Sequence, residues 1–193
     1  TQEKKKAIRT ILGIPSDVFV IGSFQKDGDG WGSGMHPKLI KGPDVFCDTV
    51  ERLAESYPVH VVLSGPARGY VKERLTRANI PFTHQHARHY AQMNNLYHAL
   101  DVYLIASRIE GVPMALLESW ATGTPLVSTR VGMVTDVGIH GQTALLADIE
   151  DHDKLAENIS NIFEDDVLRN KLISQSLLEV NHYDWDVIID RYW

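Results

Sequence analysis

Short apolar runs alternate with longer amphipathic stretches along this chain. The apolar runs are rich in β-branched residues and cover residues 18–23, 60–63, 101–106 and 125–128. Helical patterns cover residues 43–56, 69–78, 87–100 and 113–122. Strands that alternate with helices at this spacing indicate βαβ units, and strands without polar alternation are buried on both faces. The pattern predicts one α/β domain, residues 1–193, built on a doubly wound parallel sheet.

Helical patterns also occupy the two ends of the chain. The opening TQEKKKAIRT is typical of a solvated helix, and Asp151 is placed to cap the first of two helices over residues 152–163 and 165–180. The final YDWDVIIDRYW is an aromatic-rich helical pattern. It fits either an exposed apolar end that meets a missing partner domain or a helix packed on its own domain. Because the first residue is Thr1, we expect a piece of a longer protein.

Composition narrows the class of protein. The content of 44% hydrophobic and 23% charged residues is that of an ordinary globular domain, and no apolar run approaches the roughly 20 residues that span a bilayer. The net charge of -6 argues against nucleic-acid binding. The single cysteine, Cys47, fits a reducing compartment such as the cytoplasm.

Glycine or charge follows every predicted strand, and ligands of open α/β sheets bind at the carboxyl ends of strands. After the first strand, residues 25–38 form a long loop containing GDGWGSG, in which Ser33 breaks the dinucleotide-binding fingerprint. Such a loop is either a mobile flap over a ligand or a disordered insertion. Lys41 precedes Gly42-Pro43 at a predicted helix start, which favours phosphate binding, whereas Lys38 is a solvated lysine. His84, His86 and His89 lack a fourth metal ligand and indicate a polar surface loop.

The stretch EGVPMALLE, residues 110–118, contains two carboxylates around a predicted helix start. With Pro113 as the first helical residue, the N–H groups of residues 114–116 are donors for an anion. Glu110 lies in the loop before them, and Glu118 lies about 7–8 Å along the helix axis. A nucleoside diphosphate sugar has the matching polarity, with hydroxyls on either side of its phosphates. An exposed helix carboxylate at Glu118 and a dipole-stabilising one at Glu110 explain the spacing equally well.

These residues resemble the retaining glycosyltransferases of the GT-B fold, family 4 (group 1) type. The resemblance extends through LGIPSDVFVIGSF, LIKGPDVF, VVLSGPARG, LYHALDVYLIASRIEGVP, ATGTPLV, TRVGMVTDV and GIHGQTALLADIEDHDKLAENI. It implies that Glu110 approaches the transferred sugar, Glu118 the ribose and Lys41 the donor phosphates. The family's usual arginine after the first strand is Ser23 here, so Gln25 or Lys26 is expected to replace it, and its paired glycines and following glutamate become Gly132-Met133 and Asp136. The implied catalytic residues are Glu110 and Lys41, and the implied binding residues are Glu118, Gly111, Val112, Pro113, Met114, Ala115, Lys26, Gln25 and Gly132.

The resemblance implies the Rossmann-like, donor-binding C-terminal half of a glycosyltransferase. Transfer from a nucleotide sugar would be metal-independent, without a cofactor, to an acceptor held by an absent N-terminal domain. It allows a membrane-associated acceptor and a place at the cytoplasmic face of a membrane, and it predicts that the fragment alone is inactive. A nucleotide-sugar epimerase and a non-catalytic nucleotide-sugar-binding module are the alternatives. A carboxylate-pair glycosidase is disfavoured, because a helix N-terminus lies between the two carboxylates.

Overall fold

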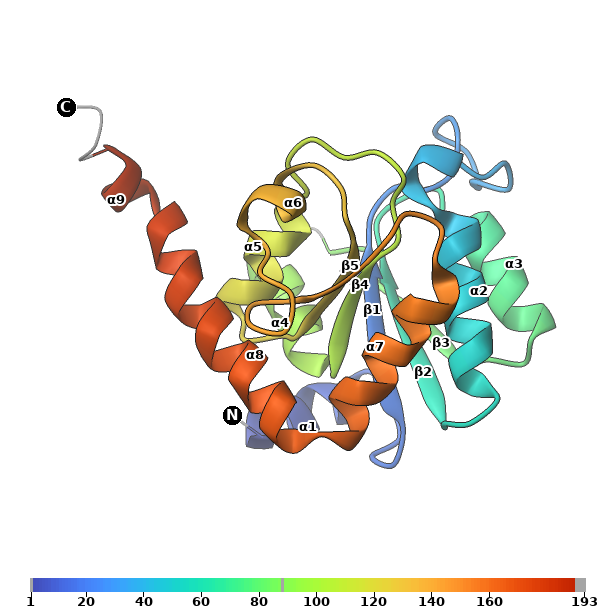
Figure 1. Cartoon of the computed structure of the whole chain (residues 1–193). Helices are drawn as coiled ribbons and strands as arrows, with labels where there is room; N and C mark the ends of the chain where they lie inside the picture. Colours follow the sequence, from blue (N-terminus) through green and yellow to red (C-terminus); the bar gives the residue numbers. More distant parts are fainter. Residues whose placement is uncertain (1, 88, 190–193) are drawn as a thin grey trace.

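A six-stranded parallel sheet forms the centre of the molecule (Figure 1). The structure is a computed structural model that describes residues 2–87 and 89–189. The strand order is β3-β2-β1-β4-β5-β6, so the chain starts in the middle and winds outward in both directions. The predicted doubly wound parallel sheet is confirmed. The strands are β1 (Phe19–Phe24), β2 (Val59–Ser64), β3 (Phe82–His84), β4 (Val102–Ile105), β5 (Leu126–Thr129) and β6 (Leu145–Ala147).

Helices cover both faces of the sheet. Neighbouring residues of β1 point into different cores, since Ile21 packs with one hydrophobic cluster and Val20 with the other. The Ile21 cluster includes side chains of α2 (Pro43–Ala54), α3 (Gly69–Arg77) and α7 (His152–Glu164). The Val20 cluster includes side chains of α4 (Tyr90–Ala99) and α5 (Met114–Ala121), and α1 (Gln2–Ile11) packs against α4. Burial on both faces explains why the strands lack polar alternation.

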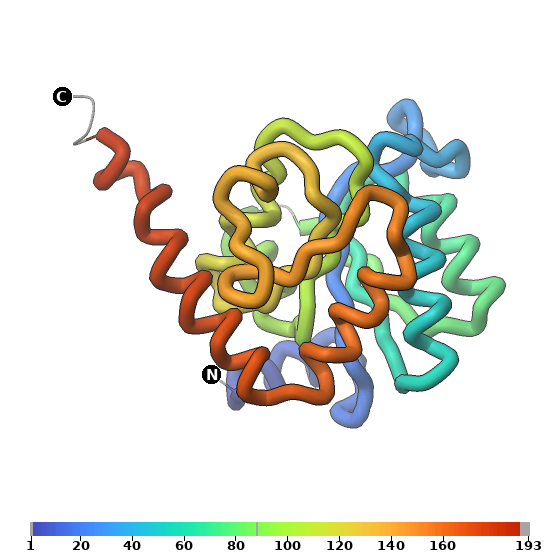
Figure 2. The backbone as a smooth tube through the Cα atoms, in the orientation of Figure 1, coloured from blue at the N-terminus to red at the C-terminus, as the bar shows by residue number. Residues whose placement is uncertain are grey.

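The C-terminal part of the chain contains the capped helix α7 and helices that lie farther from the sheet. Asp151 Oδ1 accepts a hydrogen bond of 2.9 Å from Lys154 N, which confirms the predicted cap of α7. Helix α8 (Asp166–Glu179) packs against α5 and α7, and the 3₁₀ turn η2 (Val180–Tyr183) leads to α9 (Trp185–Ile189), which points away from the body of the domain (Figure 2). Trp185 is 75% exposed. The expectation of a terminal helix packed on its own domain is therefore wrong over α9. Residues 190–193 of the predicted terminal helix lie outside the described residues.

Three short elements differ from the sequence prediction. Strands β3 and β6 have three residues each, and helix α6 (Met133–Val137) has five, too few for a hydrophobic period to show. His84 therefore ends a strand instead of lying in a surface loop, and its Nε2 is 2.9 Å from Gly65 O. Among residues 2–87 and 89–189, no helix is both long enough and apolar enough to cross a membrane.

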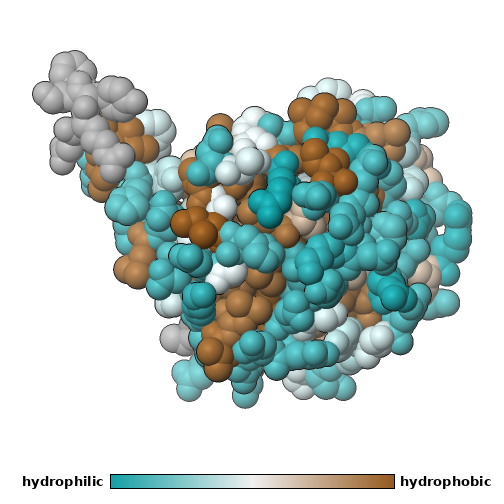
Figure 3. Space-filling view, in the orientation of Figure 1, coloured by the Kyte–Doolittle hydropathy of each residue, from teal (hydrophilic) through white to brown (hydrophobic). Residues whose placement is uncertain are grey.

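The strand order places the site-bearing loops together. Strand β1 is hydrogen-bonded to β2 on one side and to β4 on the other, so the chain departs in opposite directions at their carboxyl ends. Such a switch point leaves a crevice for a ligand. The loops after β1 and β4, with the 3₁₀ turn η1 (Leu39–Lys41), lie at the top of Figure 1, where hydrophobic side chains gather in Figure 3. Exposed apolar residues of these loops are Trp31, Met35, Leu39, Ile40, Ile109 and Val112.

Candidate functional site

A cavity of about 330 Å³ opens at the carboxyl ends of β1 and β4. Eight of the residues expected at the site line it, so the loops that carry them converge as the sheet topology requires. The lining residues are Phe24, Gln25, Lys41, Met93, Tyr103, Ile105, Glu110, Val112, Pro113, Met114, Ala115 and Glu118.

The backbone beside Lys41 packs closely against the backbone at the end of β4. Gly42 has φ +60°, and a Cβ there would lie 1.9 Å from Ala106 O at the end of β4. Only glycine therefore allows η1 and the first turn of α2 to pack against β4. The side-chain amide of Gln25 donates to Lys41 O at 3.1 Å and supports this turn from β1.

The ammonium of Lys41 and the carboxylate of Glu110 form a bidentate ion pair. Lys41 Nζ lies 2.8 and 2.7 Å from the two carboxylate oxygens, and Ser107 Oγ donates to Glu110 Oε1 at 2.7 Å. The Glu110 side chain is only 11% exposed, which limits screening by water. A phosphate entering this cavity would compete with Glu110 for the Lys41 ammonium.

The N-terminus of α5 borders the same cavity. Pro113 is the residue before the helix, with ψ 102°, and not its first helical residue as predicted. The helix begins at Met114, and Leu116 N donates to Pro113 O at 2.9 Å, so this N–H group is not a free donor. The amides of Met114 and Ala115 have no hydrogen-bond partner within residues 2–87 and 89–189. Two donors at a helix N-terminus remain for an anion.

Glu118 is held by a tyrosine that the sequence did not single out. Tyr97 Oη donates to Glu118 Oε2 at 2.8 Å. Burial raises the pKa of Tyr97 well above its ordinary value, so the hydroxyl keeps its proton at neutral pH. Glu118 and Met93 also border a second hollow, lined by Ala87, His89 and Tyr90. The two hollows therefore meet at Glu118.

Gly111 and Gly132 face each other beside the cavity. Gly132 has φ +45°, and a Cβ there would lie 2.2 Å from Gly111 O. Met133 N donates to Gly111 O at 2.8 Å. In this structure the start of α6 supports the loop that carries Glu110, and the Met133 amide is already occupied.

The loop after β1 is anchored at its base. Gly69 N and Tyr70 N donate to Ser33 O and Gly34 O at 2.8 and 2.9 Å, and Gly28 and Pro37 form an antiparallel bridge. A disordered insertion is therefore wrong for this segment. Lys26 does not line the cavity, since its Nζ lies 3.9 Å from the centroid of the Trp31 ring. Of the two residues expected to replace the family's arginine, only Gln25 lines the cavity.

An Asp-x-Asp pair, Asp27 and Asp29, follows β1 and bears on the expected metal independence. Asp27 is 1% exposed, and its Oδ1 lies 3.0 Å from Nε of the buried Arg68. Arg68 also donates to Ser23 O and Ser64 O, so this ion pair ties the ends of β1 and β2 together. In the described part of the chain, no three His, Cys, Asp or Glu side chains gather in a way that could hold a metal ion.

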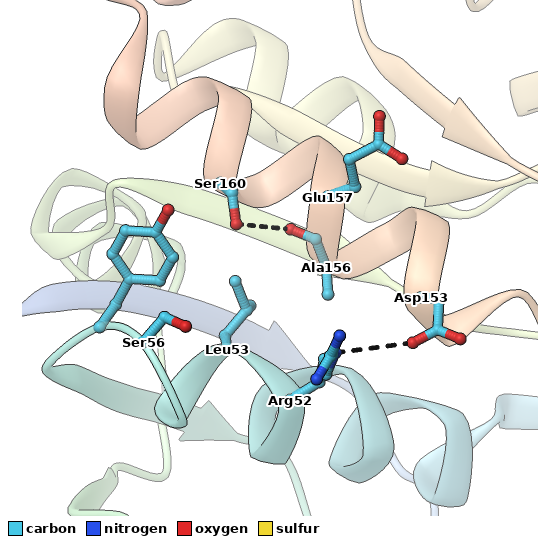
Figure 4. A pocket seen from close by; sticks show the side chains of 8 residues that line it. Arg52, Leu53, Ser56, Asp153, Ala156, Glu157 and Ser160 are labelled. Atoms are coloured by element: carbon cyan, nitrogen blue, oxygen red, sulfur yellow. Dashed lines mark hydrogen bonds and ion pairs between the residues drawn. The ribbon is translucent and has the colours of Figure 1, made fainter.

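A larger hollow of about 450 Å³ lies between α2 and α7 (Figure 4). It is lined by polar side chains, and its cation, Arg52, lies 3.8 Å from Asp153 and 2.7 Å from Glu55. Glu157 adds a second acidic side chain to its wall (Figure 4). An anionic ligand would be repelled there, so this groove lacks the chemistry of the cavity at β1 and β4.

Comparison with known proteins identifies the family. A family model described as "Glycosyl transferases group 1" matches residues 31–165. The chain is 27% identical over 201 residues to a D-inositol 3-phosphate glycosyltransferase of Corynebacterium urealyticum, covering 96% of this chain and 44% of that protein. A lipopolysaccharide core biosynthesis glycosyltransferase of Rhizobium meliloti is 35% identical over 95 residues, covering 49% of this chain and 28% of that protein. The chain thus spans less than half the length of these relatives.

Solved structures share the fold. Anabaena HepE in complex with UDP and glucose is 22% identical with a TM-score of 0.80, covering 100% of this chain and 51% of that one. The C-terminal domain of a glycosyl transferase group 1 family protein (LpcC) from Francisella tularensis is 17% identical with a TM-score of 0.76, covering 94% of this chain and 93% of that one. This chain belongs to the glycosyl transferases group 1 family, and its fold is that of the C-terminal domain of a GT-B glycosyltransferase.

Proposed function

We propose that this chain binds the donor of a retaining glycosyltransferase, a nucleoside diphosphate sugar, in the cavity at the ends of β1 and β4. The observation that carries the proposal is the convergence of Lys41, the amides of Met114 and Ala115, and two carboxylates on one cavity. A diphosphate would lie between the ammonium and the helix N-terminus. Glu110 would then approach the transferred sugar, and Glu118 the ribose.

The same groups account for a chemical role. When the bond between sugar and diphosphate breaks, negative charge develops on the leaving phosphate, and donors already aimed at that position lower the barrier. Lys41 and the start of α5 are such donors, and the proposal needs no metal ion or cofactor. Retention of configuration is supported by the motif resemblance. Under the proposal, a part of the whole protein outside this chain holds the acceptor, which is either membrane-associated or free. The proposal places the whole protein in the cytoplasm.

Calorimetric titration of the chain with UDP, GDP and ADP tests the proposal. We expect one of them to bind, and Lys41→Ala to weaken it about tenfold to a hundredfold, because a charge-assisted contact is lost and Glu110 is left unpaired beside the phosphates. Lys38→Ala is the matched control, since Lys38 does not line the cavity, and should change little. Failure of all three diphosphates to bind, or equal losses in the two variants, would overturn the proposal.

A further inference from the structure

Tyr97 links Glu118 to the rigid interior of the domain. It lies on α4 and is 1% exposed, and its hydroxyl donates to Glu118 Oε2 on α5 at 2.8 Å. Because Tyr97 is covered by protein, it does not itself line either hollow at Glu118. Tyr97 therefore acts on a ligand only through its neighbours, and the neighbour that its hydroxyl binds is the Glu118 carboxylate.

Aromatic packing holds the Tyr97 ring in place. The ring centroid of Tyr97 lies 4.9 Å from that of Phe24 at 75°, and 5.2 Å from that of Tyr103 at 34°. The main chain at Tyr97 is also tied down, since Thr124 Oγ1 donates to its carbonyl at 3.1 Å. A ring enclosed on several sides keeps one rotamer, so its hydroxyl is a donor at a defined point.

Glu118 keeps most of its acceptor capacity. A carboxylate has about four lone-pair sites, and Tyr97 occupies one of them on Oε2. Glu118 borders the cavity with Lys41 and the second hollow with Tyr90 and His89. With a diphosphate beside Lys41 and a base in the second hollow, the group between them would lie at Glu118. In a nucleoside diphosphate that group is the ribose.

We propose that Tyr97 is a positioning residue for ribose recognition, because its buried hydroxyl holds the Glu118 carboxylate with its free lone pairs toward the 2′- and 3′-hydroxyls of a bound nucleoside diphosphate. The inference rests on the proposed function and adds to it a residue that does not touch the ligand. It predicts a loss that depends on the ribose hydroxyls. A purely structural tyrosine would affect every ligand of the cavity alike.

Calorimetry with matched ligands separates the two roles. The wild-type chain and Tyr97→Phe are titrated with UDP and with 2′,3′-dideoxy-UDP, and with the GDP and ADP pairs if those bind better. We expect Tyr97→Phe to weaken the ribose form about threefold to tenfold, as for one lost hydrogen bond, and to leave the dideoxy form unchanged. Tyr70→Phe is the control, because the Tyr70 hydroxyl accepts from Arg74 Nη1 at 3.1 Å and does not line the cavity, and it should change the affinity of neither ligand.

A second variant pair isolates the contact itself. Once Glu118→Gln has been made, adding Tyr97→Phe should cause little further ribose-dependent loss, because the two changes remove one interaction. Equal loss of UDP and dideoxy-UDP in Tyr97→Phe, or no loss of either, would overturn the inference. Absence of binding by the wild-type chain to all three diphosphates is a different outcome, which refutes the proposed function and this inference together.

Discussion

Lys41 and Glu110 neutralise each other across the candidate site. The two contacts of 2.8 and 2.7 Å use both oxygens of the carboxylate, and Ser107 adds a third hydrogen bond. An approaching phosphate therefore meets an ammonium that already has a partner. Binding of a bare diphosphate and binding of a diphosphate sugar should respond differently when Glu110 is changed, because only the sugar offers the carboxylate new partners.

We expect Glu110→Ala to strengthen binding of the bare nucleoside diphosphate about threefold to tenfold, roughly 0.6–1.4 kcal/mol, since Lys41 is released and a like charge is removed. The sugar-bearing form of the same diphosphate should gain less or lose affinity, because a hydrogen-bond acceptor for the sugar is gone. Calorimetry with both ligands measures this difference. Glu110→Gln keeps the shape and an acceptor for Ser107 and should still show the gain for the bare diphosphate. Weaker diphosphate binding in Glu110→Ala would show that the carboxylate holds the site together instead of competing for Lys41.

Residue types at strand ends and helix starts were enough to predict much of this site. Gln25, Lys41, Glu110 and Glu118 all line one cavity, as do residues 112–115. Tyr97 was missed because a tyrosine in a helical pattern indicates core packing, and Tyr97 does pack in the core. Its relevance depends on where one hydroxyl points, and that direction is set by packing against Phe24. Lys26 was expected beside Gln25, but its ammonium lies over the Trp31 ring and does not line the cavity, and no local pattern shows that contact.

At the scale of elements, Arg108 joins the loop after β4 to α2. Its two terminal nitrogens donate to the Asp44 carboxylate at 2.8 Å each, and Arg108 N donates to Ile40 O at 2.9 Å. Lys41 lies on η1, directly before α2, and Glu110 lies on the loop after β4. These contacts of Arg108 with Asp44 and Ile40, which we call the clamp, therefore set the separation of the two groups that form the ion pair in the cavity.

The clamp predicts a dependence of stability on pH. Hydrogen bonds from Arg108 lower the pKa of Asp44 below the ordinary aspartate value of about 3.9. The contribution of the Asp44 charge to the free energy of unfolding is therefore complete above the ordinary pKa and is lost as the pH falls through the lower folded-state pKa. We expect Asp44→Asn to reduce the free energy of unfolding at neutral pH by about 0.5–1 kcal/mol, because the pair is partly screened by water. The variant's deficit should shrink on acidification to about pH 2.

Urea titrations at the two pH values measure this effect. Asp17→Asn, which removes an exposed carboxylate with no ion pair in the described part of the chain, is the matched control. A constant deficit of Asp44→Asn at both pH values would show that the carboxylate's charge is not what stabilises the clamp.

Elements differed in how well the sequence predicted them. The long helices and Asp151 at the start of α7 were predicted, because a period of three to four residues and a capping side chain are local signals. Pro113 fits the first helical position by its φ of −71°, yet its ψ of 102° places it before the helix. Strands β3 and β6 owe their existence to pairing with β2 and β5, which no local pattern shows.

At the scale of the whole molecule, the charge of -6 does not favour a diphosphate. Attraction must come from donors that are aimed at the phosphates, because the cavity lining holds one ammonium and two carboxylates. Lys41 and the first amides of α5 are these donors, at the edge where β1 and β4 diverge. Salt screens both the repulsion between the protein's net charge and a diphosphate and the attraction of the diphosphate to the cavity. The ligand of this site is therefore set by the groups that line the cavity, and the net charge of the protein is a poor guide to it.

Binding of a nucleoside diphosphate should be indifferent to divalent metal. The Lys41 ammonium and the amides of Met114 and Ala115 already oppose the phosphate charge, and Asp27 of the Asp-x-Asp pair is committed to Arg68. Calorimetry in excess magnesium and in excess chelator should therefore give affinities for the nucleoside diphosphate within about twofold of each other, well under 1 kcal/mol. Lys41→Ala, titrated under both conditions, should remain weak in each, because an added cation has no carboxylate cluster to hold it there. If the chelator abolished binding by the wild-type chain, a metal would be part of the donor site, and Asp29 and the histidines at 84, 86 and 89 would become the ligands to test by substitution.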